Sequence, residues 1–123
     1  MIGINDIGRN VPVDVVAGKI REITQVIKKK SPKTKLYLQS VLPINENIIW
    51  YDYMKKKSDQ IVLLNEKLKL IADEEDICYL DLYSHFTDKQ GQLLAKYTAD
   101  GIHLSAAGYL KWRDIFREER IQL

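Results

Sequence analysis

The chain has 123 residues, of which 29% are charged, and a formal net charge of +2. This length suits one domain with its own core, and the small net charge gives no electrostatic footprint for nucleic acid. No stretch is long and apolar enough to span a bilayer. We therefore expect residues 1–123 to form a single domain without a membrane span, and the cellular compartment stays open.

The N-terminal residues predict the end of a short buried strand. Met1-Ile2-Gly3-Ile4 is an apolar run, and the turn Asn5-Asp6-Ile7-Gly8 follows it. The sequence holds no signal peptide before this run. A natural domain rarely begins in the middle of a buried strand, so we expect an upstream portion to be missing.

Two apolar periodicities predict amphipathic helices. The first follows Pro12, ends at Ser31-Pro32, and places on one face the residues Val16, Ile20, Ile23 and Ile27. The second begins at Ser58, a plausible N-cap, and its apolar face holds Ile61, Leu64, Leu68 and Ile71. It ends in an acidic cluster, Asp73–Asp76, which is poorly placed for the helix dipole.

Apolar runs at Leu36–Leu42 and Ile77–Leu82 predict two further strands, with Cys78 as a small buried core residue. A loop with a turn at Asp88–Gly91 leads to a last helix capped by Ser105. Strands that alternate with helices indicate an α/β fold, a parallel sheet with helices on both faces. In such sheets the site lies beyond the carboxyl ends of the strands.

The sharpest candidate site is Asp100-Gly-Ile-His103, at a junction between a loop and a helix. Histidine can act as a general base near neutral pH, and a carboxylate on its other ring nitrogen would orient it. By itself the pattern is weak, because Asp before a helix is often only a local cap. Asn5 is a second candidate, as a donor to an oxyanion or as the centre of an Asx-turn.

The two pieces together resemble the SGNH hydrolases, also called GDSL esterases. Gly3-Ile4-Asn5-Asp6 is similar to the Gly-x-Asn-Asp block of that family, and Asp100-Gly101-Ile102-His103 to its last block, Asp-x-x-His. "LQSVLP", "YLDLY" and "DGIHLSAAGY" also fit the surroundings of these blocks. The resemblance covers essentially the whole chain and implies a three-layer, flavodoxin-like fold that lacks its first strands.

The resemblance implies an acyl-ester hydrolase, acting on short-chain or carbohydrate acetyl esters. His103 would be the base, Asp100 its orienter and Asn5 the oxyanion donor, with no cofactor and no metal. The family's nucleophilic serine, in a Gly-Asp-Ser block, is absent from this chain, and no other serine is assigned that role. We therefore expect the chain alone to be inactive. The alternative is a catalytically inactive fragment, or a binding or assembly module on the same fold.

Two expectations concern partners. The resemblance implies a small acyl-ester substrate. Its acyl or sugar pocket would be lined by three aromatic residues and a methionine, unless these form a lid packed on the core: Trp50, Tyr51, Tyr53 and Met54. Without the family's first strands, a strand at residues 1–5 would be an exposed apolar edge. We therefore expect a homo-oligomer that associates through this N-terminal edge.

Overall fold

The structure, a computed structural model, describes residues 2–121. These residues group into two compact units, each assembled from two segments of the chain. The first unit holds the residues up to Val41 together with Asp59–Asp81. The second holds Leu42–Ser58 and the residues from Leu82 onward. The motif at residues 3–6 therefore lies in the first unit, and the motif at residues 100–103 lies in the second.

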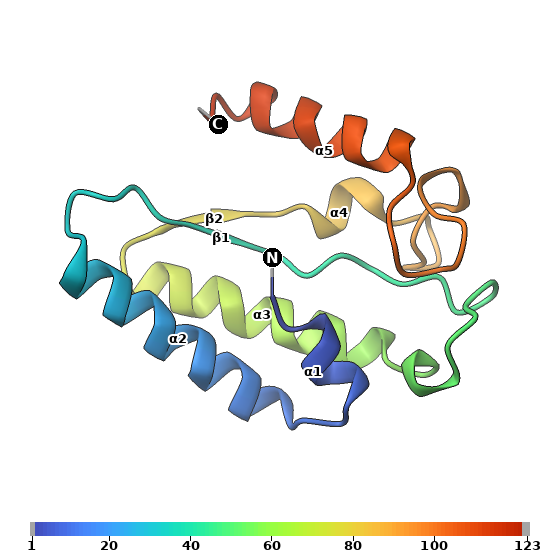
Figure 1. Cartoon of the computed structure of the whole chain (residues 1–123), viewed down its shortest axis with the longest axis horizontal. Coiled ribbons are helices and arrows are strands. Elements are labelled where there is room, and N and C mark those ends of the chain that lie inside the picture. Colours follow the sequence, from blue (N-terminus) through green and yellow to red (C-terminus); the bar gives the residue numbers. More distant parts are fainter. Residues whose placement is uncertain (1, 122–123) are drawn as a thin grey trace. The chain divides into compact units, whose positions relative to one another are not determined.

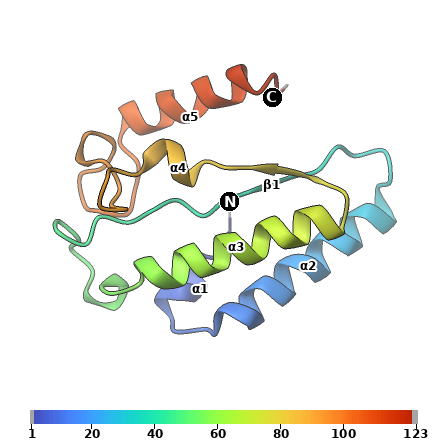
Figure 2. The ribbon, with the colours of Figure 1, turned by 180° about the vertical axis from the view of Figure 1, so that it is seen from behind.

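The first unit is built on a pair of parallel strands, β1 (Tyr37–Gln39) and β2 (Cys78–Leu80). Tyr37 lies opposite Cys78 in the ladder, and Gln39 lies opposite Leu80. Two long helices, α2 (Val13–Lys30) and α3 (Ser58–Glu74), run side by side along the strand pair (Figures 1 and 2). The predicted parallel α/β arrangement is confirmed, although both strands are shorter than their apolar runs.

The core of this unit lies on the facing sides of the helices. All four predicted apolar positions of α3 are buried, with Ile61 and Leu64 fully so. On α2 the predicted face is partly wrong, because Ile23 is 48% exposed while Thr24 is buried. Thr24 follows Ile20 by four residues and continues the buried stripe. Ile23 instead lines an open groove beside β1, together with Ile27 and Leu36.

The acidic end of α3 is accounted for by its neighbour α2. The carboxylate of Glu74 pairs with Arg21, and Gln25 donates to Glu75 at 2.7 Å. Lys28 donates to the backbone oxygen of Glu75. Cations of α2 therefore offset the unfavourable interaction between these carboxylates and the C-terminal end of the α3 dipole.

The predicted strand at the N-terminus is wrong for the described residues, and Met1 lies outside them. Gly3 has φ +112°, a value that favours glycine, and the chain turns there into the short helix α1 (Ile4–Gly8). This turn buries Ile7 completely. The edge expected at residues 1–5 is therefore not formed by residues 2–5. Self-association stays a prediction, and within residues 2–121 the sheet has two strand edges, the outer sides of β1 and β2.

The prediction for Cys78 is also wrong, because this residue is exposed. Burial along β2 increases from Cys78 through Tyr79 to Leu80, which is buried. Cys78 begins the strand next to the turn at Pro32–Lys35, where the surface is open. The apolar run therefore predicted burial correctly for Leu80 but not for Cys78, the first residue of the strand.

The second unit has fewer regular elements and more loop. It contains η1 (Asp52–Met54), α4 (Tyr83–Phe86), η2 (Ala95–Tyr97) and α5 (Ala106–Glu118). Its core is made by residues from different segments and includes Ile44, Met54, Phe86, Leu93 and Ile115. The predicted turn is confirmed by Asp88, whose Oδ1 accepts from the backbone of Gln90 and Gln92. None of the helices in the described part of the chain has the length and hydropathy to span a membrane.

Candidate active site

Asp100 and His103 form a hydrogen-bonded pair in the loop that precedes α5. The Asp100 Oδ2 atom lies 2.6 Å from the His103 Nδ1 atom. The other carboxylate oxygen, Oδ1, accepts from the backbone N–H of Ile102 at 2.9 Å and of His103 at 2.8 Å. Both oxygens of the carboxylate are thus engaged, and the imidazole is held at one defined position. Asp100 therefore caps the loop locally and orients the histidine at the same time.

The electrostatics of Asp100 fix which nitrogen of His103 carries the proton. Burial raises the pKa of this carboxyl, but the hydrogen bonds from His103 and from two backbone N–H groups outweigh it and lower the pKa to about 2. At neutral pH the carboxylate is ionised and can only accept hydrogen bonds. The Nδ1 atom of His103 is then the donor, so the neutral imidazole has its lone pair on Nε2. This is the tautomer that a general base requires.

Two residues of the loop explain why it adopts this shape. Gly101 has φ +85°, and its N–H donates to Thr98 Oγ1 at 3.0 Å. A Cβ atom at position 101 would lie 2.7 Å from the backbone oxygen of Asn45 and 2.9 Å from the Cα of Ile49. Glycine is therefore required both for the backbone conformation and for the close approach.

Ser105, at the start of α5, fixes the C-terminal end of this loop by hydrogen bonds. Ser105 is the N-cap of the helix and accepts from the N–H of Gly108, as predicted. The Ser105 N–H donates to the Tyr97 oxygen at 2.7 Å. Ser105 is thus used for capping.

The His103 side chain is open to solvent, while its partner is not. The exposed fraction is 72% for the His103 side chain and 13% for the Asp100 side chain. The Tyr51 ring stands edge-on to the imidazole, with ring centroids 6.1 Å apart. A base of this kind is accessible to a reacting group and flanked on one side by an aromatic ring.

The remaining candidates lie elsewhere in the chain. Asn5 is exposed on α1, in the first unit, whereas Asp100 and His103 lie in the second. Its part as an oxyanion donor stays a prediction. Ser40 is fully buried, and the second histidine, His85, is exposed on α4.

The four residues at 50–54 whose role the sequence left open differ in burial. Met54 is buried in the core of the second unit, and Tyr51 is partly exposed beside His103. Trp50 and Tyr53 are exposed, with 71% and 56% of their surface accessible. Sequence reasoning missed the residues that hold this segment, Glu46 and the buried Asn45. The signal was Asn45-Glu46 after Pro43, where short polar side chains bond to nearby backbone.

Comparison with known proteins now adds the family. Residues 1–111 match the model of the GDSL-like lipase/acylhydrolase family. The chain belongs to this family, as the resemblance of its two motifs indicated. No curated protein matches the chain.

Solved structures confirm the predicted fold class. A Streptococcus pneumoniae protein, provisionally assigned as a platelet activating factor, is 30% identical with a TM-score of 0.89, and the match covers 97% of this chain and 56% of that one. A GDSL-like lipase from Bacteroides thetaiotaomicron is 26% identical with a TM-score of 0.80, over 95% of this chain and 58% of that one. The chain thus spans little more than half the length of these relatives.

Proposed function

We propose that the chain is part of an acyl-ester hydrolase domain that acts on short-chain or carbohydrate acetyl esters. The observation that carries the proposal is the pair of Asp100 and His103, 2.6 Å apart, with His103 exposed to solvent. Membership of the GDSL-like lipase/acylhydrolase family supports the same reaction. The 123 residues contain no Gly-Asp-Ser, so the nucleophilic serine comes from outside them.

In this proposal His103 moves the protons. Its Nε2 atom takes the proton of the serine hydroxyl as the Oγ atom attacks the ester carbonyl carbon. The same proton then passes to the leaving alkoxide, which departs as the alcohol. In a second round His103 takes a proton from water as the water attacks the acyl carbon. His103 then returns this proton to the departing serine Oγ atom, which releases the carboxylic acid and restores the free enzyme. Asp100 stays ionised throughout and stabilises the imidazolium that forms in each round.

Asn5 has a different part in the same proposal. Its side-chain NH2 group donates to the oxyanion of the tetrahedral intermediate. The exposure of Asn5 on the first turn of α1 is compatible with this contact. Removing one such donor costs about 10²–10³ in kcat in other hydrolases.

The experiment is hydrolysis of p-nitrophenyl acetate by two proteins side by side. One is this chain, and the other is a longer form that includes an upstream Gly-Asp-Ser segment from the same gene. We expect turnover in the longer form only, lowered by about 10³-fold or more in His103→Ala. Asn5→Ala should reduce kcat with a smaller effect. His85→Ala is the matched control, because His85 is the second histidine, is exposed, and should keep full activity.

Three results would contradict the proposal. Turnover by the 123 residues alone that needs His103 would mean that the nucleophile lies within the chain. A longer form that stays active without His103 would mean that another residue is the base. A longer form that stays inactive would support the alternative of a binding or assembly module.

A further inference from the structure

A segment beside the candidate base combines exposed aromatic rings with a fixed backbone. We call residues Glu46–Ser58 the aromatic loop, since it contains Trp50, Tyr51 and Tyr53. All of it belongs to the second unit, as do Asp100 and His103. Compact loops whose ends meet are frequently functional.

The two ends of the aromatic loop are tied together. The Oε1 atom of Glu46 accepts from the Ser58 hydroxyl at 2.6 Å and from the Ser58 N–H at 3.1 Å. Burial raises the pKa of Glu46, but these bonds and others from the backbone of Lys56 and Lys57 outweigh it and lower that pKa. The closing contact is therefore made by an ionised carboxylate, which makes stronger hydrogen bonds than a neutral group.

The base of the loop is also anchored to its surroundings. The buried side chain of Asn45 donates to the Leu93 oxygen at 2.7 Å and accepts from the Asn47 N–H at 3.1 Å. The Glu46 N–H donates to the side chain of Gln92 at 2.7 Å. Met54 anchors the other side of the loop by its burial in the core.

The aromatic loop is fixed directly against the loop of the candidate base. Asn45 donates through its backbone to the Gly101 oxygen at 2.8 Å, and Trp50 donates in the same way to the Asp100 oxygen at 3.3 Å. The Tyr51 ring joins the two sides, since it contacts both His103 and Tyr53, with centroids 6.1 Å and 5.9 Å apart. The Tyr51 ring and the backbone of Trp50 are therefore held at a set place relative to His103 and Asp100.

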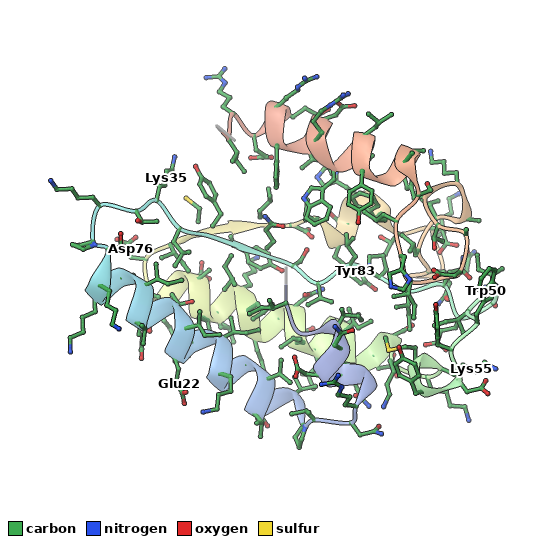
Figure 3. All side chains as sticks on the ribbon, viewed as in Figure 1. Glu22, Lys35, Trp50, Lys55, Asp76 and Tyr83 are labelled. Carbon is green, nitrogen blue, oxygen red and sulfur yellow. The ribbon has the colours of Figure 1, made fainter. Side chains whose placement is uncertain are left out.

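Within this fixed frame two large rings are left uncovered. Trp50 projects from the ribbon of its loop (Figure 3), and it is 71% exposed. Tyr53 is 56% exposed, while Ile49 and Met54 of the same loop are buried. The loop thus buries Ile49 and Met54, while it leaves Trp50 and Tyr53 largely exposed and Ile48 exposed to a lesser degree, at 38%. Leaving a tryptophan exposed forgoes the free energy of burying it, and exposed apolar surface near a site often binds a ligand.

We propose that Trp50 and Tyr53 form a binding platform for the sugar ring of the ester substrate, an inference that rests on the proposed function. A pyranose has an apolar C–H face and a rim of hydroxyls. The indole of Trp50 offers a flat apolar face, and the same loop carries exposed hydrogen-bonding groups on Asn47 and on Asp52, whose Oδ1 atom accepts from Lys55. An alkyl chain gains most when a concave apolar pocket encloses it. A flat exposed ring with polar neighbours matches the sugar better.

The test is a binding measurement on the 123-residue chain, which needs no nucleophile. Trp50 and Trp112 are the only tryptophans, so Trp112→Phe leaves Trp50 as the single fluorescent reporter. Into this variant we would titrate mono-O-acetylated xylotriose and, separately, hexanoyl-lysophosphatidylcholine below its micelle concentration. We expect a saturable change in emission with the sugar ester only. Tyr53→Ala in the same background should weaken binding about tenfold.

Calorimetry covers the variant that removes the reporter. Trp50→Ala should weaken binding of the acetylated sugar about tenfold or more. Tyr109→Ala is the matched control, because Tyr109 is an equally exposed aromatic residue on α5 of the same unit, and affinity should not change. Circular dichroism would verify that each variant keeps its helices.

Three results would overturn the inference: no saturable response to the sugar ester, equal affinity in Trp50→Ala, or a response to the lysolipid alone. None of these affects hydrolysis of p-nitrophenyl acetate by the longer form, which has no sugar. Conversely, sugar binding without any hydrolysis would leave the platform in place and reject the catalytic proposal. The two failures are therefore distinguishable.

Discussion

The interior of each unit is stabilised by a different kind of interaction. The first depends on apolar stripes of two long helices, with Ile61 and Leu64 fully buried. The second has a core drawn from separate segments and many bonds between side chains and backbone, such as those accepted by Asp88 and Asp100. The apolar core of the first unit can be predicted from the spacing of apolar residues along its helices. The hydrogen-bonded framework of the second unit depends on single polar residues. The candidate base lies in the second kind of framework.

The largest expected effect compares one glycine from each unit. Gly101→Ala should destabilise the protein by about 3 kcal/mol or more, because the added Cβ meets backbone atoms of Asn45 and Ile49 and the φ of +85° is strained for alanine. Gly18→Ala, in the middle of α2, should instead stabilise it by about 0.5–1 kcal/mol, since a Cβ there meets nothing within 4 Å. Urea unfolding of both variants measures the two free energies.

A small cost for Gly101→Ala would break the comparison. It would mean that the loop before α5 can move away from the aromatic loop, so that the position of His103 is not fixed by Gly101. The Gly18→Ala variant controls for a general effect of replacing glycine. Loss of stability in that variant would show that α2 does not tolerate an added methyl group.

The same difference explains how much was readable from the sequence. The face of α3 was predicted in full because its apolar spacing has one interpretation. Ile23 was misplaced on α2 because a three-four spacing allows either Ile23 or Thr24 to continue the stripe. The strand expected at residues 1–5 was wrong for residues 2–5 because an apolar run of that length fits a strand or the start of a helix, and the turn at Gly3 decides between them.

For the site, Asp100 and His103 were predicted because their spacing is local and Asp at a turn has few geometries. The aromatic loop was not, since its closure joins Glu46 to Ser58 and its anchors join Asn45 to Leu93 and Gly101. These contacts link residues 12 to 56 positions apart, and no periodic pattern marks them. The closure of the aromatic loop therefore depends on single polar residues, which a search for periodic patterns does not detect.

Titration of Tyr79 tests the first unit. Burial raises the pKa of this phenol to about 12, and the charge of Asp81 adds to the rise, against a hydrogen bond with Ser40 that lowers it. The folded state then loses stability between about pH 10 and 12, because the unfolded chain releases this proton first. Following phenolate absorbance, we expect Tyr79 to titrate near pH 12, and Tyr79→Phe should remove that step.

If every tyrosine titrated together in the folded protein, burial at Tyr79 would be weaker than its packing under α3 implies. Asp81→Asn separates the two causes of the shift. It should lower the pKa of Tyr79 by only part of the difference, because burial is the larger cause.

Titration of Asp100 tests the second unit, and here the shift has the opposite sign. Burial would raise its pKa, but hydrogen bonds lower it from 3.8 to about 2. The stability that this carboxylate provides is present above about pH 4 and is lost as the pH falls through about 2. The difference in unfolding free energy between the parent and Asp100→Asn should therefore shrink over that acid range. Carbon NMR of the carboxyl groups measures the pKa directly.

His103→Ala divides the Asp100 shift between its donors. Removing the imidazole should raise the pKa of Asp100, yet leave it below 3.8, because the N–H groups of Ile102 and residue 103 still donate to Oδ1. A return to the ordinary value would mean that the imidazole alone holds the carboxylate, and that the loop takes its shape from the histidine. A partial return would mean that the backbone forms the carboxylate site first and His103 occupies a position already prepared for it. Only in the second case does the loop orient the base before any substrate arrives.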